Sequence, residues 1–381
     1  MSLPDVPVID DLREASRASN KRTLAKLLKR LEDQIQLPEC LRVVGHLRRS
    51  RYFDTETSLR RAFLARREIF VRDACEDASR WLAPYERAKK LTDVHRVHVF
   101  DVVTQYRAIF SDDVDDSDDV TTTSNNNSNV STITVTANES MVLLSAWASQ
   151  RAESYRSALD ESLARIDEGG ALASVFEHCE YCGNSLARVG VETRPLLRDI
   201  FEKHALRIFE DALGAASEAF EKSLSTHRWT TYLGFTASSS EQEQESKNKT
   251  GDDAETNNNN TNEFAPPQSL LEHAPVAAFV NGVLAAFNEV RLLSPKLKSC
   301  RKPFAKALRK TFENGKTLLK NEERAILKTG SETKKEAWSS AWTSLESCAA
   351  PYCAKCFDKL LRLDADCDGR TASALLASLS I

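Results

Sequence analysis

Residues 96–113, RVHVFDVVTQYRAIFSDD, are the stretch that decides the fold of this chain. Its large apolar residues fall three or four positions apart, the spacing that places side chains on one face of an α-helix. The residues of this face are Val99, Val102, Val103, Tyr106 and Phe110. Because an acidic run follows at once, we expect the helix to end near Phe110 and its apolar face to be buried.

The composition of the whole chain indicates a globular, helical protein. The 381 residues are enough for two or three compact units, and 41% of them are hydrophobic and 28% charged. Only 12 Gly and 11 Pro interrupt a sequence rich in Ala, Leu, Glu, Lys and Arg, and no sustained alternating pattern occurs. We therefore predict an all-α fold of antiparallel helical bundles. The net charge of -4 is too small to imply a polyanionic partner.

The sequence shows neither a secretory signal nor a membrane-spanning segment. After Met1 the chain reads SLPDVPVIDD, which has no basic start and no apolar core. Its longest apolar stretch, 275–287, is interrupted by Asn281 and Gly282 and is shorter than the roughly 20 residues that a spanning helix needs. We expect membrane association to be peripheral or through partners.

Two polar, low-complexity segments divide the chain. They hold too little apolar surface to offset the entropy of ordering them, so we predict that both are disordered. The predicted organisation is a first helical bundle (1–110), a disordered acidic and Ser/Thr/Asn insert (111–138), a second bundle (139–236), a disordered polar insert (237–265), a third bundle (266–363) and a tail (364–381).

Helical spacing and local signals give the expected helices. In the first block, one helix stops before Pro38, a short one turns Leu41, Val44 and Leu47 inward, and a third is capped by Asp54 or Thr55. Further helices are expected over 85–110, 141–159, 175–186, 195–224, 276–293, 303–321 and 332–363, with Gly169 and Gly170 as the break between the second and third of these.

Two C-x-x-C pairs, Cys179 with Cys182 and Cys353 with Cys356, invite a zinc or redox hypothesis. His178 lies beside the first pair, but nothing similar flanks the second, and both pairs fall within predicted helices. Residues three apart share a helical face, so core packing explains the spacing equally well. With nine scattered cysteines, we expect free thiols, several buried, in a protein exposed to the cytosol.

The tail segment 364–369, DADCDG, matches the opening of a calcium-binding loop. Position nine of that loop is Ala372, and position twelve, which should be a bidentate Glu, is Leu375. We therefore favour an acidic helix terminus followed by a glycine cap. No metal, cofactor or catalytic residue is predicted anywhere in the chain.

An arginine concentration suggests an alternative function, a helical adaptor for anionic lipid or nucleic acid. Its residues are Arg48, Arg49, Arg51, Arg60, Arg61, Arg66 and Arg67. Tyr52 and Phe53 do not interleave with them as a stacking platform requires, so a solvated or partner-binding face is favoured. The seven histidines are spread out, and no P-loop, G-x-S-x-G, dinucleotide fingerprint or H-E-x-x-H occurs. An enzyme is not expected.

Four stretches in order resemble one known family, the eighth subunits of the conserved oligomeric Golgi complex. They are the opening stretch at 96–113, QLPECLRVVGHLRR at 36–49, FEHCEYCGNSLARVG at 176–190 and AAFVNGVLAAFNEVRL at 277–292. The resemblance spans roughly residues 5 to 362. It implies helical bundles in the rod-like array of tethering subunits, without an active site.

The resemblance also implies a function and partners. Members of this family act in vesicle tethering, intra-Golgi retrograde transport and protein transport, on the cytosolic face of the Golgi membrane. The implied partners are other subunits of the complex, notably the first, together with membrane-fusion proteins and small GTPases. Neither nucleic acid nor an integral membrane contact is implied. Family members carry a coiled coil before the equivalent of Asp5, so weaker or no pairing with the first subunit is expected here, with association retained through the helical body.

Overall fold

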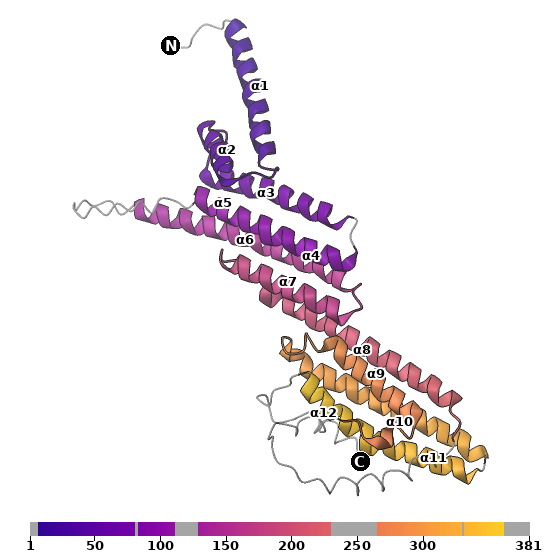
Figure 1. The fold of residues 1–381 in the computed structure, drawn as a ribbon. Coiled ribbons are helices and arrows are strands. Elements are labelled where there is room, and N and C mark those ends of the chain that lie inside the picture. The colour runs from indigo at the N-terminus through magenta and orange to yellow at the C-terminus, as the bar shows by residue number, and fades with distance from the viewer. Residues whose placement is uncertain (1–6, 81–82, 111–128, 230–264, 330, 362–381) are drawn as a thin grey trace, which may run out of the picture. The chain divides into compact units, whose positions relative to one another are not determined.

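The computed structural model describes residues 7–80, 83–110, 129–229, 265–329 and 331–361. These residues form helices joined by short turns, and no strand occurs among them, which confirms the all-α prediction (Figure 1). They belong to two compact units, Met1–Ile166 with Ser174–Ile200 (unit 1) and Asp167–Ala173 with Phe201–Ile381 (unit 2). One boundary between the units falls between α6 and α7, and the other two fall within α7 and α8. The predicted three-bundle organisation stays a prediction.

Unit 1 is built from the first eight α-helices. They are α1 (Pro7–Arg30), α2 (Leu37–Arg49), α3 (Glu56–Ser79), α4 (Pro84–Val94), α5 (Phe100–Phe110), α6 (Asn129–Leu163), most of α7 (Gly169–Ala187) and the start of α8 (Arg194–Thr226), with a π-helical segment, η1 (His95–Val99), joining α4 to α5. In Figure 1, α3, the α4–η1–α5 helix and α6 lie side by side, and α3, α4 and α6 are in mutual contact.

Local sequence sets several helix ends as predicted. Thr55 caps α3, because its side chain accepts a hydrogen bond from the backbone N–H of Ser58 at 3.1 Å. Pro38 lies in the first turn of α2 and Pro84 in that of α4, where the missing N–H costs nothing.

The face of the 96–113 stretch is buried in the core of unit 1. Val99, Val102, Val103, Tyr106 and Phe110 are each at most 2% exposed. The ring of Phe63, from α3, lies 6.1 Å from the ring of Tyr106 and 5.5 Å from that of Phe110. Since α5 also contacts α2 and α6, this one face joins four helices.

Two local expectations need correction. Leu41 is 44% exposed, because α2 buries the face of Cys40, Val44 and Leu47, about 100° away. Helix α6 begins at Asn129, inside the predicted first insert, since a helix that has nucleated elsewhere extends at little cost. The remainder of that insert, 111–128, and residues 237–264 of the second insert lie outside the described residues, as do residues 230–236 at the end of the predicted second bundle.

Gly169 and Gly170 were predicted to lie between two helices, but they form the first turn of the second one. The chain leaves α6 at Leu163, and α7 begins at Gly169 itself. The backbone N–H of Gly169 donates to Oε2 of Glu289 at 2.7 Å, and the Glu289 carbonyl group lies where a β-carbon on residue 169 would be. Glycine is therefore needed here for close approach of the start of α7 to the end of α9 within unit 2.

Unit 2 is organised around phenylalanine rings. Besides parts of α7 and α8 it contains η2 (Gln268–Leu270), α9 (Ala274–Val290), η3 (Lys298–Cys300), α10 (Arg301–Thr329), α11 (Glu332–Thr343), the π-helical segment η4 (Ser344–Ala349) and α12 (Ala350–Leu360). Phe209 of α8 lies 4.9 Å from Phe304 and 6.2 Å from Phe287 between ring centroids. Phe287 in turn lies 5.5 Å from Phe357. These contacts tie α8, α9, α10 and α12 into one core.

Within the described residues, none of the helices combines the length and the apolar character that crossing a bilayer requires.

We predict that Val103→Asp destabilises unit 1 by about 3–5 kcal/mol, because Val103 is 0% exposed and the new carboxylate would be buried without a partner. Thr104→Asp, on the exposed side of the same helix, is the matched control and should change the free energy of unfolding by less than about 0.5 kcal/mol. Urea unfolding followed by circular dichroism measures both. Equal stability of the two variants would mean that this face is not a core face.

We predict that Gly169→Ala lowers the free energy of unfolding of unit 2 by about 1–3 kcal/mol, because the added methyl group overlaps the Glu289 carbonyl. Gly170→Ala is the control, since a β-carbon there meets nothing within 4 Å. It should leave stability unchanged or slightly raised. Thermal unfolding of the two variants would contradict the close approach if both melted like the unsubstituted protein.

Candidate functional site

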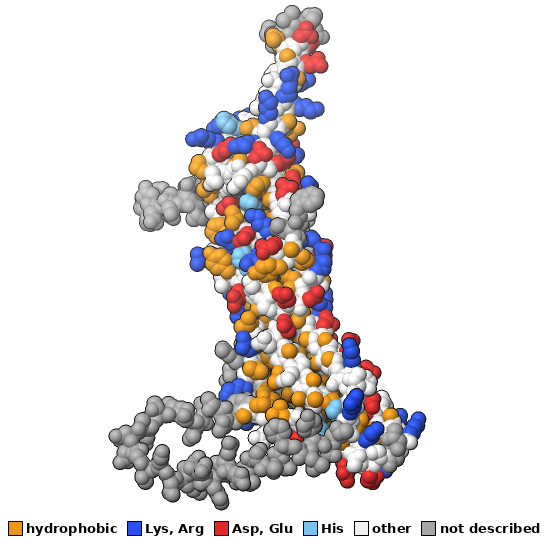
Figure 2. Space-filling view, turned by 45° about the vertical axis from the view of Figure 1, so that its right-hand side comes forward, with side chains coloured by type: hydrophobic (Ala, Val, Ile, Leu, Met, Phe, Trp, Pro, Cys, Tyr) orange, Lys and Arg blue, Asp and Glu red, His pale blue; other side chains and the backbone are white. Residues whose placement is uncertain are grey.

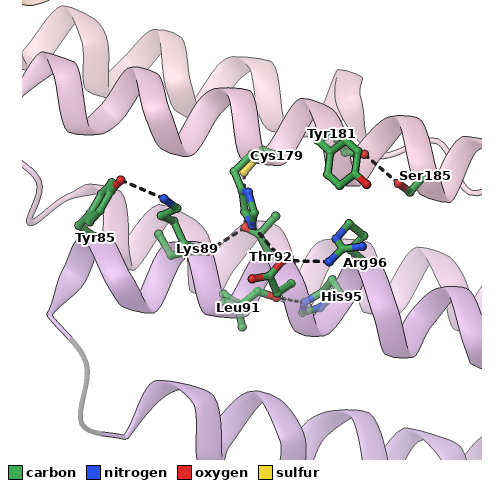
Figure 3. Close-up of polar contacts among 12 residues, drawn as sticks. Tyr85, Lys89, Leu91, Thr92, His95, Arg96, Cys179, Tyr181 and Ser185 are labelled. Carbon is green, nitrogen blue, oxygen red and sulfur yellow. Dashed lines mark hydrogen bonds and ion pairs between the residues drawn. The ribbon is translucent and has the colours of Figure 1, made fainter.

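A concentration of buried polar groups in unit 1 lies where α4 meets α6 and α7, and Figure 3 shows three of its members, Thr92, His95 and Cys179. Thr92 of α4, Tyr155 of α6 and Cys179 of α7 form its centre. The Thr92 hydroxyl donates to the Ala88 carbonyl at 2.7 Å and lies 2.8 Å from the Tyr155 hydroxyl. The Tyr155 hydroxyl is 3.2 Å from the sulfur of Cys179. We call these residues, together with His95, the buried polar cluster.

His95 occupies the first position of the π-helical segment and is 3% exposed. Its Nδ1–H donates to the Leu91 carbonyl at 2.9 Å, and its ring stacks on Tyr155 with centroids 4.3 Å apart. Its other nitrogen, Nε2, is buried and has no hydrogen-bond partner among the described residues. Burial lowers the pKa of His95 to about 4, because protonation would create a buried charge without an acceptor.

The electrostatics of the cluster oppose catalysis at neutral pH. Burial raises the pKa of the Cys179 thiol to about 11, despite its hydrogen bonds to Tyr155 and Thr92. Burial also raises the pKa of Tyr155 well above its usual value. The thiol, phenol and imidazole are therefore all neutral near pH 7. A nucleophile or general base needs the opposite adjustment, so the cluster is suited to holding helices together.

More exposed contacts around the buried polar cluster connect the helix of α4 and η1 to α7. The carboxylate of Asp93 accepts hydrogen bonds from Nε2 of His178 at 3.0 Å and from Arg96 at 3.3 Å. The Arg96 guanidinium also lies 5.3 Å from the ring centroid of Tyr181. Toward the start of α4, the Tyr85 hydroxyl lies 3.1 Å from the Ser174 hydroxyl and accepts from Lys89 at 3.1 Å. Figure 3 shows Tyr85 beside Lys89 on α4 and, farther along, Arg96 facing Tyr181 of α7.

The two C-x-x-C pairs lie in separate compact units, the first in α7 and the second in α12. All four thiols are buried and not in disulfides. Burial raises the pKa of Cys182 to about 12 and raises the pKa of Cys353 and of Cys356 above the ordinary value. The described part of the chain contains no group of three or more His, Cys, Asp or Glu side chains arranged to hold a metal ion. The calcium-like segment 364–375 lies outside the described residues.

The arginines of 48–67 do not form one basic face. Arg67 is 1% exposed, and its guanidinium donates to the carbonyls of Leu31 and Asp33 at 3.0 and 2.8 Å, beyond the end of α1. Arg48 bonds Glu56 and the Ile109 carbonyl, whereas Arg66 pairs with Glu32. On the face drawn in Figure 2, basic and acidic side chains intermix.

These arginines therefore serve the fold of unit 1. Arg60, also buried, lies with its guanidinium 5.7 Å from the ring centroid of Phe110. Three of the seven arginines, Arg49, Arg51 and Arg61, are exposed and form no ion pair with a carboxylate in the described structure. The density of unpaired positive charge here is therefore lower than a helical adaptor for anionic lipid or nucleic acid would need.

Sequence reasoning did not identify the buried polar cluster. Thr92 and His95 lie three apart on a helical face that also carries Leu91 and Val99, and this polar pair on an apolar face was the available signal. Tyr155 and Cys179 carried no signal that linked them to it.

Comparisons with known proteins give the chain a family context. The model of the Dor1-like family matches residues 1–218. Conserved oligomeric Golgi complex subunit 8 of Homo sapiens is 31% identical over 290 residues, which are 76% of this chain and 43% of the human protein. The subunit 8 proteins of Mus musculus and Drosophila melanogaster are 32% and 28% identical over 290 residues, again 76% of this chain and 41% and 46% of those proteins. No solved structure matches the chain.

The chain thus spans less than half the length of the curated relatives it matches.

We predict that acidification destabilises unit 1 through His95. In the unfolded chain its pKa is near 6.5, and in the folded chain it is about 4. Its stabilising effect is therefore complete above pH 6.5 and is lost as pH falls toward 4, by roughly 3 kcal/mol in total. His95→Phe keeps a ring against Tyr155 but removes this titration, so the difference in unfolding free energy between about pH 7 and about pH 4.5 should shrink.

His46→Gln serves as the control, because His46 is exposed. Its variant should keep the pH dependence of the unsubstituted protein in urea unfolding. The same loss of stability in the His95→Phe protein and in the unsubstituted one would show that His95 does not govern this dependence.

Proposed function

The chain belongs to the Dor1-like family, and from this premise we propose that it acts as a subunit of the conserved oligomeric Golgi complex. The similarity to subunit 8 proteins over 290 residues carries the proposal. It extends over 76% of the chain and agrees with the resemblance seen in the four sequence stretches, which the family match confirms.

We propose that the chain works without catalysis, as a set of helical surfaces. Its buried polar cluster is neutral near pH 7 and joins α4, α6 and α7. The long helices α6, α8 and α10 have 35, 33 and 29 residues. Helices of this length present side faces on which partner helices can lie. Such packing assembles a complex without any chemical step.

We propose other subunits of the same complex as the direct partners, with the first subunit as the foremost candidate. Membrane-fusion proteins and small GTPases are proposed as further partners of the assembled complex. The proposed location is the cytosolic face of the Golgi membrane, and the proposed process is intra-Golgi retrograde transport. The similarity to subunit 8 proteins supports subunits of the complex as partners, and the finer statements rest on what the resemblance of the four sequence stretches implies.

Affinity purification tests the proposal. The tagged full chain, expressed in cells that lack the endogenous protein, should recover other subunits of the tethering complex and restore Golgi glycosylation. Val103→Asp should lose both properties, because the core of unit 1 fails, whereas Thr104→Asp should retain both. Recovery of no tethering subunit by the unsubstituted chain, together with normal glycosylation in its absence, would refute the assignment.

A further inference from the structure

Helix α10 and the turn before it carry the strongest local charge in the described chain. Residues 290–312 contain eight Lys and Arg and no Asp or Glu, although the whole chain has a net charge of -4. An excess of this size, in a chain that is acidic overall, sets one part of unit 2 apart from the rest.

The basic side chains of α10 fall on one helical face. We call this the basic face, and it consists of Lys302, Lys306, Lys310, Lys320, Arg324 and Lys328. At about 100° per residue these positions lie within about 80° of one another around the helix axis. They extend along nearly its whole length, which is about 40 Å at 1.5 Å per residue. Every one of them is exposed.

The opposite face of α10 is fixed in the core of unit 2. Phe304, Leu308, Phe312 and Leu319 are each 0% exposed. The helix therefore cannot turn its apolar side outward, and only the basic face is available to a partner.

The charges of the basic face are not neutralised within the described structure. Lys302, Lys306 and Lys310 make no ion pair there, and neither do Arg324 and Lys328. The acidic residue on this face, Glu313, is paired with Arg309 at 2.9 Å. Lys320 lies 5.5 Å from the ring centroid of Trp342. Two rows of basic groups therefore face outward, Lys302, Lys306 and Lys310 in the first and Lys320, Arg324 and Lys328 in the second, with about one helical turn between successive members of each row.

The chemistry of these rows fits a diffuse anionic surface. Lysine is depleted at protein–protein interfaces, where aromatic and apolar side chains dominate. Lysine is also a hydrated point charge without the planar geometry that reads single phosphates or carboxylates in bidentate fashion. A row of lysines instead gains from the field of many headgroups at once. The basic face presents no exposed aromatic ring for stacking on bases.

We propose that the basic face of α10 binds directly to anionic phospholipid headgroups at a membrane surface. This contact is additional to attachment through partner subunits. It does not depend on the proposed function, since any membrane-associated chain could use it. Exposed Leu327, 54% accessible, lies beside Arg324 and Lys328 and adds an apolar contact at the headgroup boundary.

Vesicle sedimentation with the purified full chain tests this proposal. Vesicles of phosphatidylcholine with phosphatidylserine should bind the chain, pure phosphatidylcholine vesicles should not, and added salt should weaken the binding. The K302Q, K306Q and K310Q triple variant should bind on the order of 100-fold more weakly, at about fivefold for each lysine neutralised.

A matched control carries K21Q, K26Q and K222Q, which remove the same charge from exposed positions of α1 and α8. It should bind like the unsubstituted chain, and circular dichroism should show unchanged melting for both variants. Equal weakening in the control, no binding to phosphatidylserine vesicles, or preference for a DNA duplex over those vesicles would overturn the proposal. Recovery of tethering subunits by the triple variant separates this result from the test of the proposed function.

Discussion

Unit 1 depends on the burial of one helical face, the apolar face of η1 and α5. Val103 and Phe110 are buried, and the rings of Phe63 and Tyr106 lie 5.5 and 4.9 Å from the ring of Phe110. Hydrophobic burial is non-directional, so it brings α2, α3 and α6 together without fixing their register. Polar groups supply that register. Arg67 from α3 and Gln105 from α5 donate to carbonyls at Leu31, Asp33 and Ile35, where α1 has ended and its backbone acceptors have no helical partner.

This use of polar groups explains why two residue patterns were ambiguous in the sequence. Seven arginines close together suggested a surface for an anionic partner, yet two of them are buried and two more pair with glutamates. The C-x-x-C spacing suggested ligands, yet three-residue spacing is also that of a buried helical face. In both cases residue types were clear from the sequence, whereas the direction of each side chain depended on which helices surrounded it.

The helical class, most helix ends and the core residues of 96–113 could be predicted, because they depend on periodicity and capping within a few residues. Thr55 and Pro38 are examples. The contact between Tyr155 and Cys179 could not be predicted, since it joins separate helices through a hydroxyl and a thiol that look ordinary in the sequence. Gly169 was misread for the same reason. The carbonyl of Glu289, which requires glycine there, comes from a helix 120 positions further along the chain.

The π-helical segments let a single helix change neighbours partway along its length. Apolar spacing runs unbroken from Ala88 to Phe110, but residues in a π turn advance by less than the 100° of an α-helix. The buried side is thereby rotated, so α4 packs on α3 while α5 reaches α2. In unit 2, α11 likewise packs on α10 and α12 on α9, with η4 between. Each rotation replaces a loop, which would have exposed backbone groups and cost closure entropy. The change of direction of the buried face is built into the helix, so one continuous helix can pack against several others without an additional loop.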